Sequence, residues 1–183
     1  MKINIGAGDS EYEDYVRIDY DANSNPDHVL DLEKDSLPFD DSTVEAVIAH
    51  HVLEHLGEGY FHCLQELYRV CKHGALIDIR VPHPRHDTFL ADPTHRRPIT
   101  TIGLQLFSKK FNELCRKQKF ASSRLGEYYN VDFEISNFKY IPDENAIAKL
   151  PNLNTSEIEQ VADLYNNIIL EVHIQLIVIK NEQ

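Results

Sequence analysis

The chain has 183 residues, of which 42% are hydrophobic and 26% charged, a composition that can bury a core without disulfides or metals. Its formal net charge of -12 argues against a protein that holds nucleic acid by neutralising phosphates, because such domains are usually basic. The three cysteines, Cys63, Cys71 and Cys115, form no CxxC pair, which argues against a disulfide framework and a zinc site. We expect a single domain over residues 1–183, cytoplasmic, with no signal peptide and no apolar run long enough to span a bilayer.

The first part of the chain predicts strands that alternate with loops and one helix. The predicted strands cover residues 3–5, 16–19, 27–32, 43–50 and 75–82. The predicted helix has an apolar face at steps of three and four, formed by Phe61, Leu64, Leu67, Tyr68 and Cys71. Gly74 is expected to end that helix in a left-handed conformation. Strands joined by such connections predict a parallel sheet.

The second part of the chain has a different character. Residues 83–100 show little periodicity and predict a loop, and a helix is expected at about 101–118. Residues 130–141 and 167–180 alternate between apolar and polar side chains, as in an antiparallel pair of strands. A further helix is expected between these strands, with Asn154 or Thr155 as its N-cap.

A glycine pair and an acid mark the ends of the first two strands. Gly6 and Gly8 follow the first strand, where glycine lets the backbone approach a ligand closely. Asp19 ends the second strand, where a carboxylate can bind two ribose hydroxyls. On its own, Gly-x-Gly is equally compatible with an ordinary turn.

Further motifs in the same order strengthen the cofactor interpretation. The segments "NIGAG", "LPF", "HVLEHL" and "LYRVCKHG" resemble those of the class I S-adenosylmethionine-dependent methyltransferases of the small single-domain type, over residues 1–82. The resemblance implies one three-layer α/β domain, with a mostly parallel, seven-stranded Rossmann-like sheet in the order 3-2-1-4-5-7-6 and an antiparallel last strand. It also implies S-adenosylmethionine as the cofactor.

The resemblance assigns roles to the residues that follow the strands. The turn after the first strand would line the methionine moiety, the acid after the second would bind ribose, and the pair after the third would meet adenine. The implied cofactor-binding residues are Gly6, Ala7, Gly8, Asp19, Tyr20, Asp31, Leu32 and His50.

The first crossover departs from the family pattern. Ser10 stands where a third glycine is expected, and only ten residues separate Gly8 from Asp19, too few for a crossover helix. The connection is therefore expected to be a loop or a single turn, leaving one side of the cofactor poorly covered. Without a helix N-terminus for a pyrophosphate, a nicotinamide dinucleotide is disfavoured.

Histidines after the fourth strand are candidates for proton transfer, because their pKa suits neutral pH. His51 stands beside the predicted cofactor edge and is the first candidate base; His55 and Glu54 are interpreted as fixing the turn. The sequence predicts no metal site. No HExxH motif is present, and "HVLEH" places its glutamate next to the second histidine.

The loop after the fifth strand is the candidate acceptor pocket. It carries "DPTHRRP", which looks like a segment of family members that methylate sugars or other small polar acceptors. His95 is a second candidate base, and Arg85, Arg96 and Arg97 are candidate substrate-binding residues that could grip a carboxylate or phosphate. The alternative is a solvated loop whose charges have no such role.

The sequence thus predicts methyl transfer from S-adenosylmethionine to a small polar acceptor, anionic or sugar-containing ones included. The partner would be that small molecule, with no membrane or nucleic acid and no indication of oligomeric state. One alternative is a non-catalytic S-adenosylmethionine-binding module or subunit that shapes a partner. A methyltransferase for protein or nucleic acid is disfavoured by the acidic charge.

Overall fold

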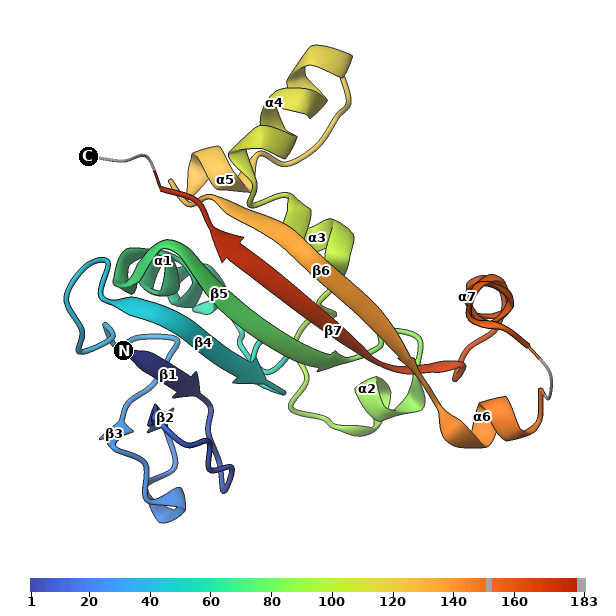
Figure 1. Ribbon diagram of the computed structural model, residues 1–183, viewed down its shortest axis with the longest axis horizontal. Helices are drawn as coiled ribbons and strands as arrows, with labels where there is room; N and C mark the ends of the chain where they lie inside the picture. Colours follow the sequence, from blue (N-terminus) through green and yellow to red (C-terminus); the bar gives the residue numbers. More distant parts are fainter. Residues whose placement is uncertain (151–152, 181–183) are drawn as a thin grey trace.

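A computed structural model describes residues 1–150 and 153–180. Their strands form one seven-stranded sheet (Figure 1). Its order is β3-β2-β1-β4-β5-β7-β6, and β7 runs antiparallel to both neighbours while the other pairings are parallel. The predicted order and the antiparallel last strand are confirmed. The strands are β1 (Lys2–Ile5), β2 (Tyr15–Asp19), β3 (His28–Val29), β4 (Val44–His50), β5 (Cys71–Pro82), β6 (Phe133–Pro142) and β7 (Ile169–Val178).

The helices agree with the prediction in part. The expected amphipathic helix is α1, and the expected helix at 101–118 is two helices, because Ser108 interrupts it and caps the second by accepting a hydrogen bond from Phe111 N. The loop at 83–100 contains the short helix α2. The helices are α1 (Tyr60–Val70), α2 (Asp87–Ala91), α3 (Thr101–Gln105), α4 (Lys109–Gln118), α5 (Leu125–Tyr128), α6 (Glu144–Ala148) and α7 (Thr155–Leu164), with a 3-10 helix η1 (Ala22–Ser24).

The prediction for Gly74 is wrong. Helix α1 ends at Val70, and Cys71 already begins β5 with an extended backbone. Gly74 does have a left-handed conformation, with φ of +78°, but it lies within β5, where the pairing with β4 shifts register. Glycine is used here to pass a strand irregularity rather than to end a helix.

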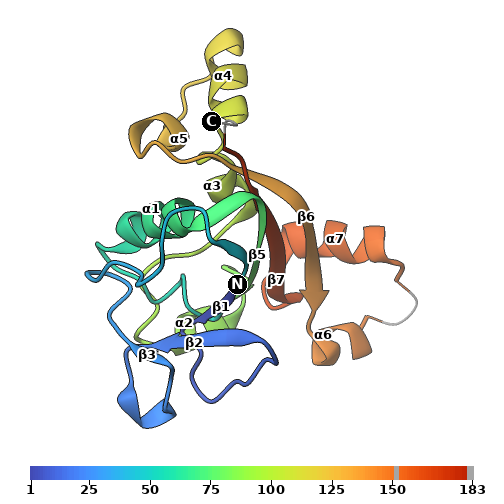
Figure 2. The same cartoon turned by 60° about the vertical axis from the view of Figure 1, so that its left-hand side comes forward.

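The insertion between β6 and β7 forms a small helical unit. Helices α6 and α7 lie together beyond the ends of these strands (Figures 1 and 2). The predicted cap of α7 is confirmed, because Asn154 accepts a hydrogen bond from Glu157 N and Glu157 returns one to Asn154 N. Among the described residues, no helix is both long enough and apolar enough to cross a membrane.

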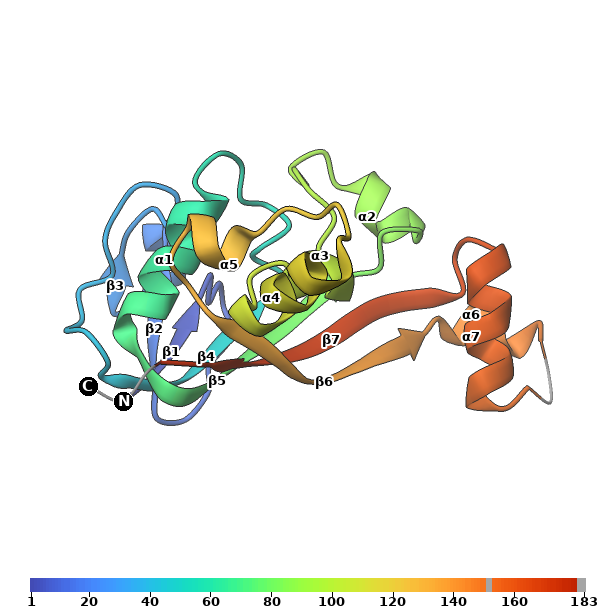
Figure 3. The same cartoon turned by 90° about the horizontal axis from the view of Figure 1, so that it is seen from above.

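The expected third layer is not present among the described elements. Helices α1, α3, α4 and α5 lie on the same side of the sheet (Figure 3). The connections between β1, β2, β3 and β4 contain turns and η1 but no α-helix, and the first two are too short for a full crossover helix. The sheet is therefore covered by helices on one face, and the expectation of three layers is corrected to two.

Side-chain alternation in β5 and β7 matches this one-sided cover. On β5 the buried residues Ile77, Ile79 and Val81 face the helices, whereas Leu76, on the opposite face, is 46% exposed. Strand β7 repeats the pattern, with buried Val172, Ile174, Leu176 and Val178 alternating with half-buried residues. A sheet that is packed on one face and open on the other shows this alternation.

Candidate active site

The candidate active site is a cleft of about 800 Å³ at the carboxyl ends of β1, β2 and β4. Ligands of open α/β sheets bind at this edge, and the volume lies in the usual range for ligand pockets. The lining residues come from the strand tips and from the loop around residue 95. They are Gly6, Asp19, Tyr20, Val29, Leu30, Asp31, Leu32, Glu33, Asp35, His51, Val52, His55, Leu56, Thr94 and Arg96.

The turn after β1 needs glycine for two reasons. Gly6 has a left-handed φ of +57°, and a Cβ built on it would lie 2.4 Å from Val52 Cγ2. Gly8 is also left-handed, with φ of +49°, but a Cβ there would meet no atom within 4 Å. The Gly6 backbone therefore packs directly against the Val52 side chain in the segment after β4, and both residues line the cleft.

Asp19 joins the glycine turn to the tip of β2. Its carboxylate accepts hydrogen bonds from Gly8 N at 2.7 Å and from Asp21 N at 2.9 Å, and its side chain is mostly buried. Arg17 supports the same turn by donating to the carbonyl oxygen of Gly8. A carboxylate has about four acceptor positions, so the oxygens retain capacity for hydroxyl donors from the cleft.

The predicted adenine side also lies on the cleft. Asp31 pairs with Lys34 at 2.6 Å and accepts from Glu33 N at 2.9 Å, and the Lys34 hydrogen bond lowers the pKa of Asp31. Leu32 is buried and Tyr20 is 80% exposed, and both line the cleft. This side combines apolar surface with a carboxylate that stays ionised at neutral pH.

Three predicted cofactor residues do not line the cleft. Ala7 is buried, and Gly8 turns its amide to Asp19. His50 makes contacts elsewhere, with Nε2 at 3.1 Å from Asp78 Oδ1 and Nδ1 at 3.2 Å from Tyr12 Oη. Burial lowers the pKa of His50. These residues lie around the cleft rather than on its surface.

His51, the predicted base, does line the cleft and has an unusual backbone. Its φ of +54° is left-handed, a conformation that side-chain-bearing residues seldom adopt away from functional sites and turns. Its Nδ1 lies 3.4 Å from Glu54 Oε1, and its Nε2 lies 3.4 Å from Glu171 Oε1. The Glu54 carboxylate raises the pKa of His51, against the effect of burial.

The arginines of the loop at 83–100 differ in what they contact. Arg96 is exposed and lines the cleft. Arg97 donates to the carbonyl oxygens of Leu56 and Gly57 and stacks 4.4 Å from the ring centre of Tyr60. Of the two, only Arg96 lines the cleft.

Arg85 and His95 are also engaged with the protein. Arg85 donates to the carbonyl oxygens of Ala162 and Asp163 near the end of α7. The ring of His95 stacks on Phe89, and its Nδ1 is 2.7 Å from the carbonyl oxygen of that residue. Neither is among the residues that line the cleft.

Sequence reasoning missed several residues that shape the cleft. Val52 packs on Gly6, and Glu33 accepts hydrogen bonds from Gly57 N and Gly59 N, both at 2.9 Å, which fixes the loop before α1. His55 accompanies them on the lining. The motif "HVLEHLGEG" contains part of this set, but no local spacing indicates the contact with Glu33.

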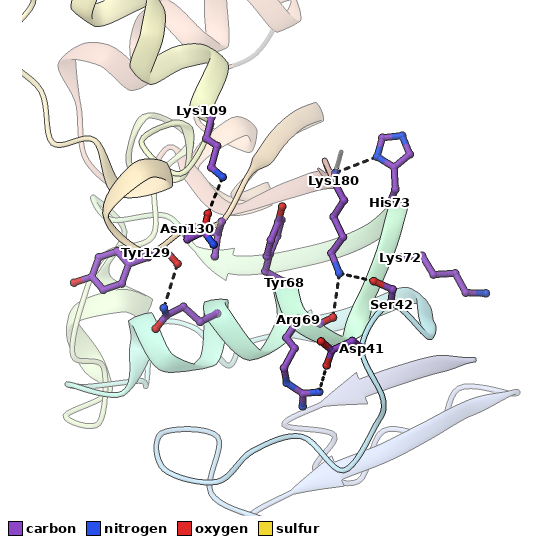
Figure 4. Close-up of a pocket in the computed structure, with 12 residues that line it drawn as sticks. Asp41, Ser42, Tyr68, Arg69, Lys72, His73, Lys109, Tyr129, Asn130 and Lys180 are labelled. Carbon is purple, nitrogen blue, oxygen red and sulfur yellow. Dashed lines mark hydrogen bonds and ion pairs between the residues drawn. The ribbon is translucent and has the colours of Figure 1, made fainter. Parts of the chain in front are cut away.

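A larger cavity, of about 1100 Å³, lies at the opposite edge of the sheet (Figure 4). Lys180 reaches across it to Ser42 Oγ and to the carbonyl oxygen of Arg69, and Lys72 and Lys109 add positive charge. It borders the amino ends of β4 and β5, away from the glycine turn. The smaller cleft is therefore the candidate active site.

Comparisons with known proteins agree with this geometry. A family model described as a methyltransferase domain matches residues 10–78. A solved S-adenosylmethionine-dependent methyltransferase from Archaeoglobus fulgidus superposes with a TM-score of 0.64 at 18% identity, covering 96% of this chain and 85% of that one. The chain has the fold of the class I methyltransferases. The resemblance expected from the motifs is confirmed.

Other solved structures with the class I fold are similar in the same way. An S-adenosylmethionine-dependent methyltransferase from Methanosarcina mazei has a TM-score of 0.56 at 15% identity, covering 98% of this chain and 92% of that one. The [4+2]-cyclase SpnF has a TM-score of 0.55 at 14% identity, with coverage of 98% and 75%. A search of curated protein sequences finds no significant match. The comparisons support S-adenosylmethionine-dependent methyl transfer in general and leave the acceptor open.

Proposed function

We propose that the protein transfers a methyl group from S-adenosylmethionine to a small polar acceptor, in a class that includes anionic and sugar-containing molecules. The proposal is carried by one observation, the hydrogen bond that joins Gly8 N to Asp19 Oδ2 and brings the glycine turn and the acid to the same cleft. This pairing suits a ligand with a ribose and no phosphate, since the turn leads into no helix N-terminus.

The residues of the cleft fit the cofactor in kind. Gly6 presents backbone without a side chain, Asp19 has acceptor capacity for two hydroxyls, and Leu30 and Leu32 offer apolar surface for a flat base. Bound S-adenosylmethionine would supply an electrophilic methyl group. The protein's part is then to place the acceptor in line with it, which supplies much of the reduction in the barrier.

His51 and Arg96 are the proposed acceptor-side residues. Both line the cleft together with Gly6, so an acceptor that touches them lies near the methionine end of the proposed cofactor site. His51 would accept the proton of a hydroxyl or ammonium acceptor, and Arg96 would hold a carboxylate or phosphate through its planar fork. Arg85, Arg97 and the ring of His95 have protein partners instead, so they are assigned no contact with the acceptor.

The second candidate function is a non-catalytic S-adenosylmethionine-binding module. The observation that favours it is that the connections between β1, β2, β3 and β4 contain no α-helix, so the helices found there in the usual family fold are missing beside the cleft. A fold shared with a [4+2]-cyclase also shows that this architecture serves other chemistry. Bound cofactor without turnover would favour this candidate.

A labelled-methyl screen of small polar acceptors tests the proposal. Native protein should transfer label to at least one acceptor, and His51→Asn should lower turnover by about 100-fold or more if its imidazole is the base. Arg96→Ala should raise the Michaelis constant more than it lowers turnover, because such a clamp holds ground and transition states alike. Tight binding of S-adenosylhomocysteine with no transfer to any acceptor class would reject the enzyme and retain the binding module.

A further inference from the structure

Glu54 is a buried acid whose carboxylate has no hydrogen-bond partner within the described part of the chain. It lies in the turn after β4, its side chain is 0% exposed, and neither carboxylate oxygen forms a hydrogen bond within the described part of the chain. His51 Nδ1 is 3.4 Å from Oε1, which is longer than a good hydrogen bond. A buried carboxylate in this state is costly unless a cation neutralises it.

Two imidazoles stand beside that carboxylate. His55 follows Glu54 in the chain, and His95 comes from the loop that packs on the same turn through hydrogen bonds from Arg96 N and Arg97 N to the carbonyl oxygen of Glu54. The ring centres of the two histidines are 4.6 Å apart. One potential ligand atom from each of Glu54, His55 and His95 lies within 4.8 Å of the others.

In each of the two histidines, Nδ1 is already within hydrogen-bond distance of another protein group. His95 Nδ1 is 2.7 Å from the carbonyl oxygen of Phe89, which can only accept, so Nδ1 carries the proton and the lone pair is on Nε2, 3.9 Å from Asp92 Oδ2. His55 Nδ1 is 2.8 Å from Thr94 Oγ1, and Thr94 is itself tied to Asp92 Oδ1 at 2.6 Å. Histidines that bind metals show this arrangement, with the second nitrogen held by a carbonyl, a carboxylate or a polar neighbour.

We propose that Glu54, His55 and His95 form a binding site for a divalent transition-metal ion, with Zn²⁺ as its representative. Two imidazoles and one carboxylate are the donors that such ions prefer, whereas Mg²⁺ and Ca²⁺ favour oxygen ligands. The spacing of "HVLEH" alone does not predict the site, because the third ligand lies 40 residues further along the chain.

Three protein ligands leave a coordination position open, as in catalytic rather than structural zinc sites. His55 lines the cleft together with Thr94 and Arg96, so that position is accessible from the acceptor side. If the proposed methyl transfer is correct, the ion would hold an oxygen of the acceptor there. This consequence rests on the proposed function, whereas metal binding does not.

Calorimetric titration of Zn²⁺ into chelator-treated protein, without cofactor or acceptor, tests the site. Native protein should bind one equivalent, and Mg²⁺ should not compete for it. Glu54→Gln and, independently, His95→Asn should weaken Zn²⁺ binding by more than about 100-fold, whereas Thr94→Ala, which removes only an outer partner, should cost about 10- to 100-fold. His73→Asn, which alters an exposed histidine at the opposite edge of the sheet, should leave binding unchanged.

Thermal unfolding gives a readout that a structural role of Glu54 would not produce. Without metal, Glu54→Gln should melt at or above the temperature of native protein, because a buried carboxylate with no hydrogen-bond partner, and with His51 no nearer than 3.4 Å, is removed. With Zn²⁺, native protein should melt higher than the variant, because the ion binds its folded state. Absent binding by native protein, or unchanged binding in both ligand variants, would overturn the proposal and leave the methyltransferase assignment intact.

Discussion

The two walls of the cleft are built in different ways. The strand-tip wall consists of Gly6, Asp19 and Asp31, each of which lies at or within two residues of the carboxyl end of a parallel strand. The loop wall consists of His51, His55 and Arg96, which are brought together when the loop at residues 92–97 packs on the turn after β4. Strand order alone therefore positions the first wall, whereas the second depends on contacts between segments distant in sequence.

The largest effect on stability is expected in the strand-tip wall, when a methyl group is added at Gly6. Gly6→Ala combines left-handed strain with a clash against Val52, so we expect a loss of about 2 to 4 kcal/mol in the free energy of unfolding. Gly8→Ala is the matched control, since it carries the strain without the clash and should lose about 1 to 2 kcal/mol. Urea denaturation measures both, and equal losses would show that the Val52 contact does not constrain the turn.

In the loop wall, we expect Arg97→Ala to lower the free energy of unfolding and Arg96→Ala to leave it nearly unchanged. Arg97→Ala removes the hydrogen bonds to two carbonyl groups and the stacking on Tyr60, so we expect a loss of about 2 kcal/mol in the free energy of unfolding. Arg96→Ala should change it by less than about 0.5 kcal/mol, as exposed positions usually do. The same denaturation experiment compares the two neighbours. A larger loss in Arg96→Ala would reverse the roles assigned to them.

The smallest effect expected is a pH dependence of native stability that arises from His50. Burial lowers the pKa of His50 in the folded state, and Asp78, Tyr12, Arg80 and His51 surround its ring. The unfolded chain therefore takes up the proton first as pH falls below the ordinary histidine pKa of about 6.5. Native stability should fall through that window, down to the lowered pKa, and then change no further on account of His50.

His50→Asn removes this contribution while the other titrating groups stay common to both proteins. The free energy of unfolding of the native protein, measured relative to this variant, should thus decrease on acidification from about pH 7.5 to 5.5. A difference between the two proteins that is independent of pH would show that burial does not shift the titration of His50.

The sequence predicted the strand-tip wall because its signals are local. Alternation of strands and loops indicates a parallel sheet, and the carboxyl end of each strand then indicates where Gly6, Asp19 and Asp31 meet. The ten residues between Gly8 and Asp19 also predicted a first crossover without a helix. The absence of α-helices from the next two connections has no comparable local signal. The side chains of the loop at 83–100 could not be assigned, because the partners of Arg85 and Arg97 lie 77 and 40 residues away, respectively.

Calorimetry with S-adenosylhomocysteine tests the central claim, that the cleft binds the cofactor at the tip of β2. Native protein should bind it and should not bind a nicotinamide dinucleotide. Asp19→Ala removes two charge-assisted hydrogen bonds to the ribose, so affinity should fall at least tenfold, or about 1.4 kcal/mol. Unchanged affinity in Asp19→Ala, or binding of the dinucleotide by native protein, would contradict the account.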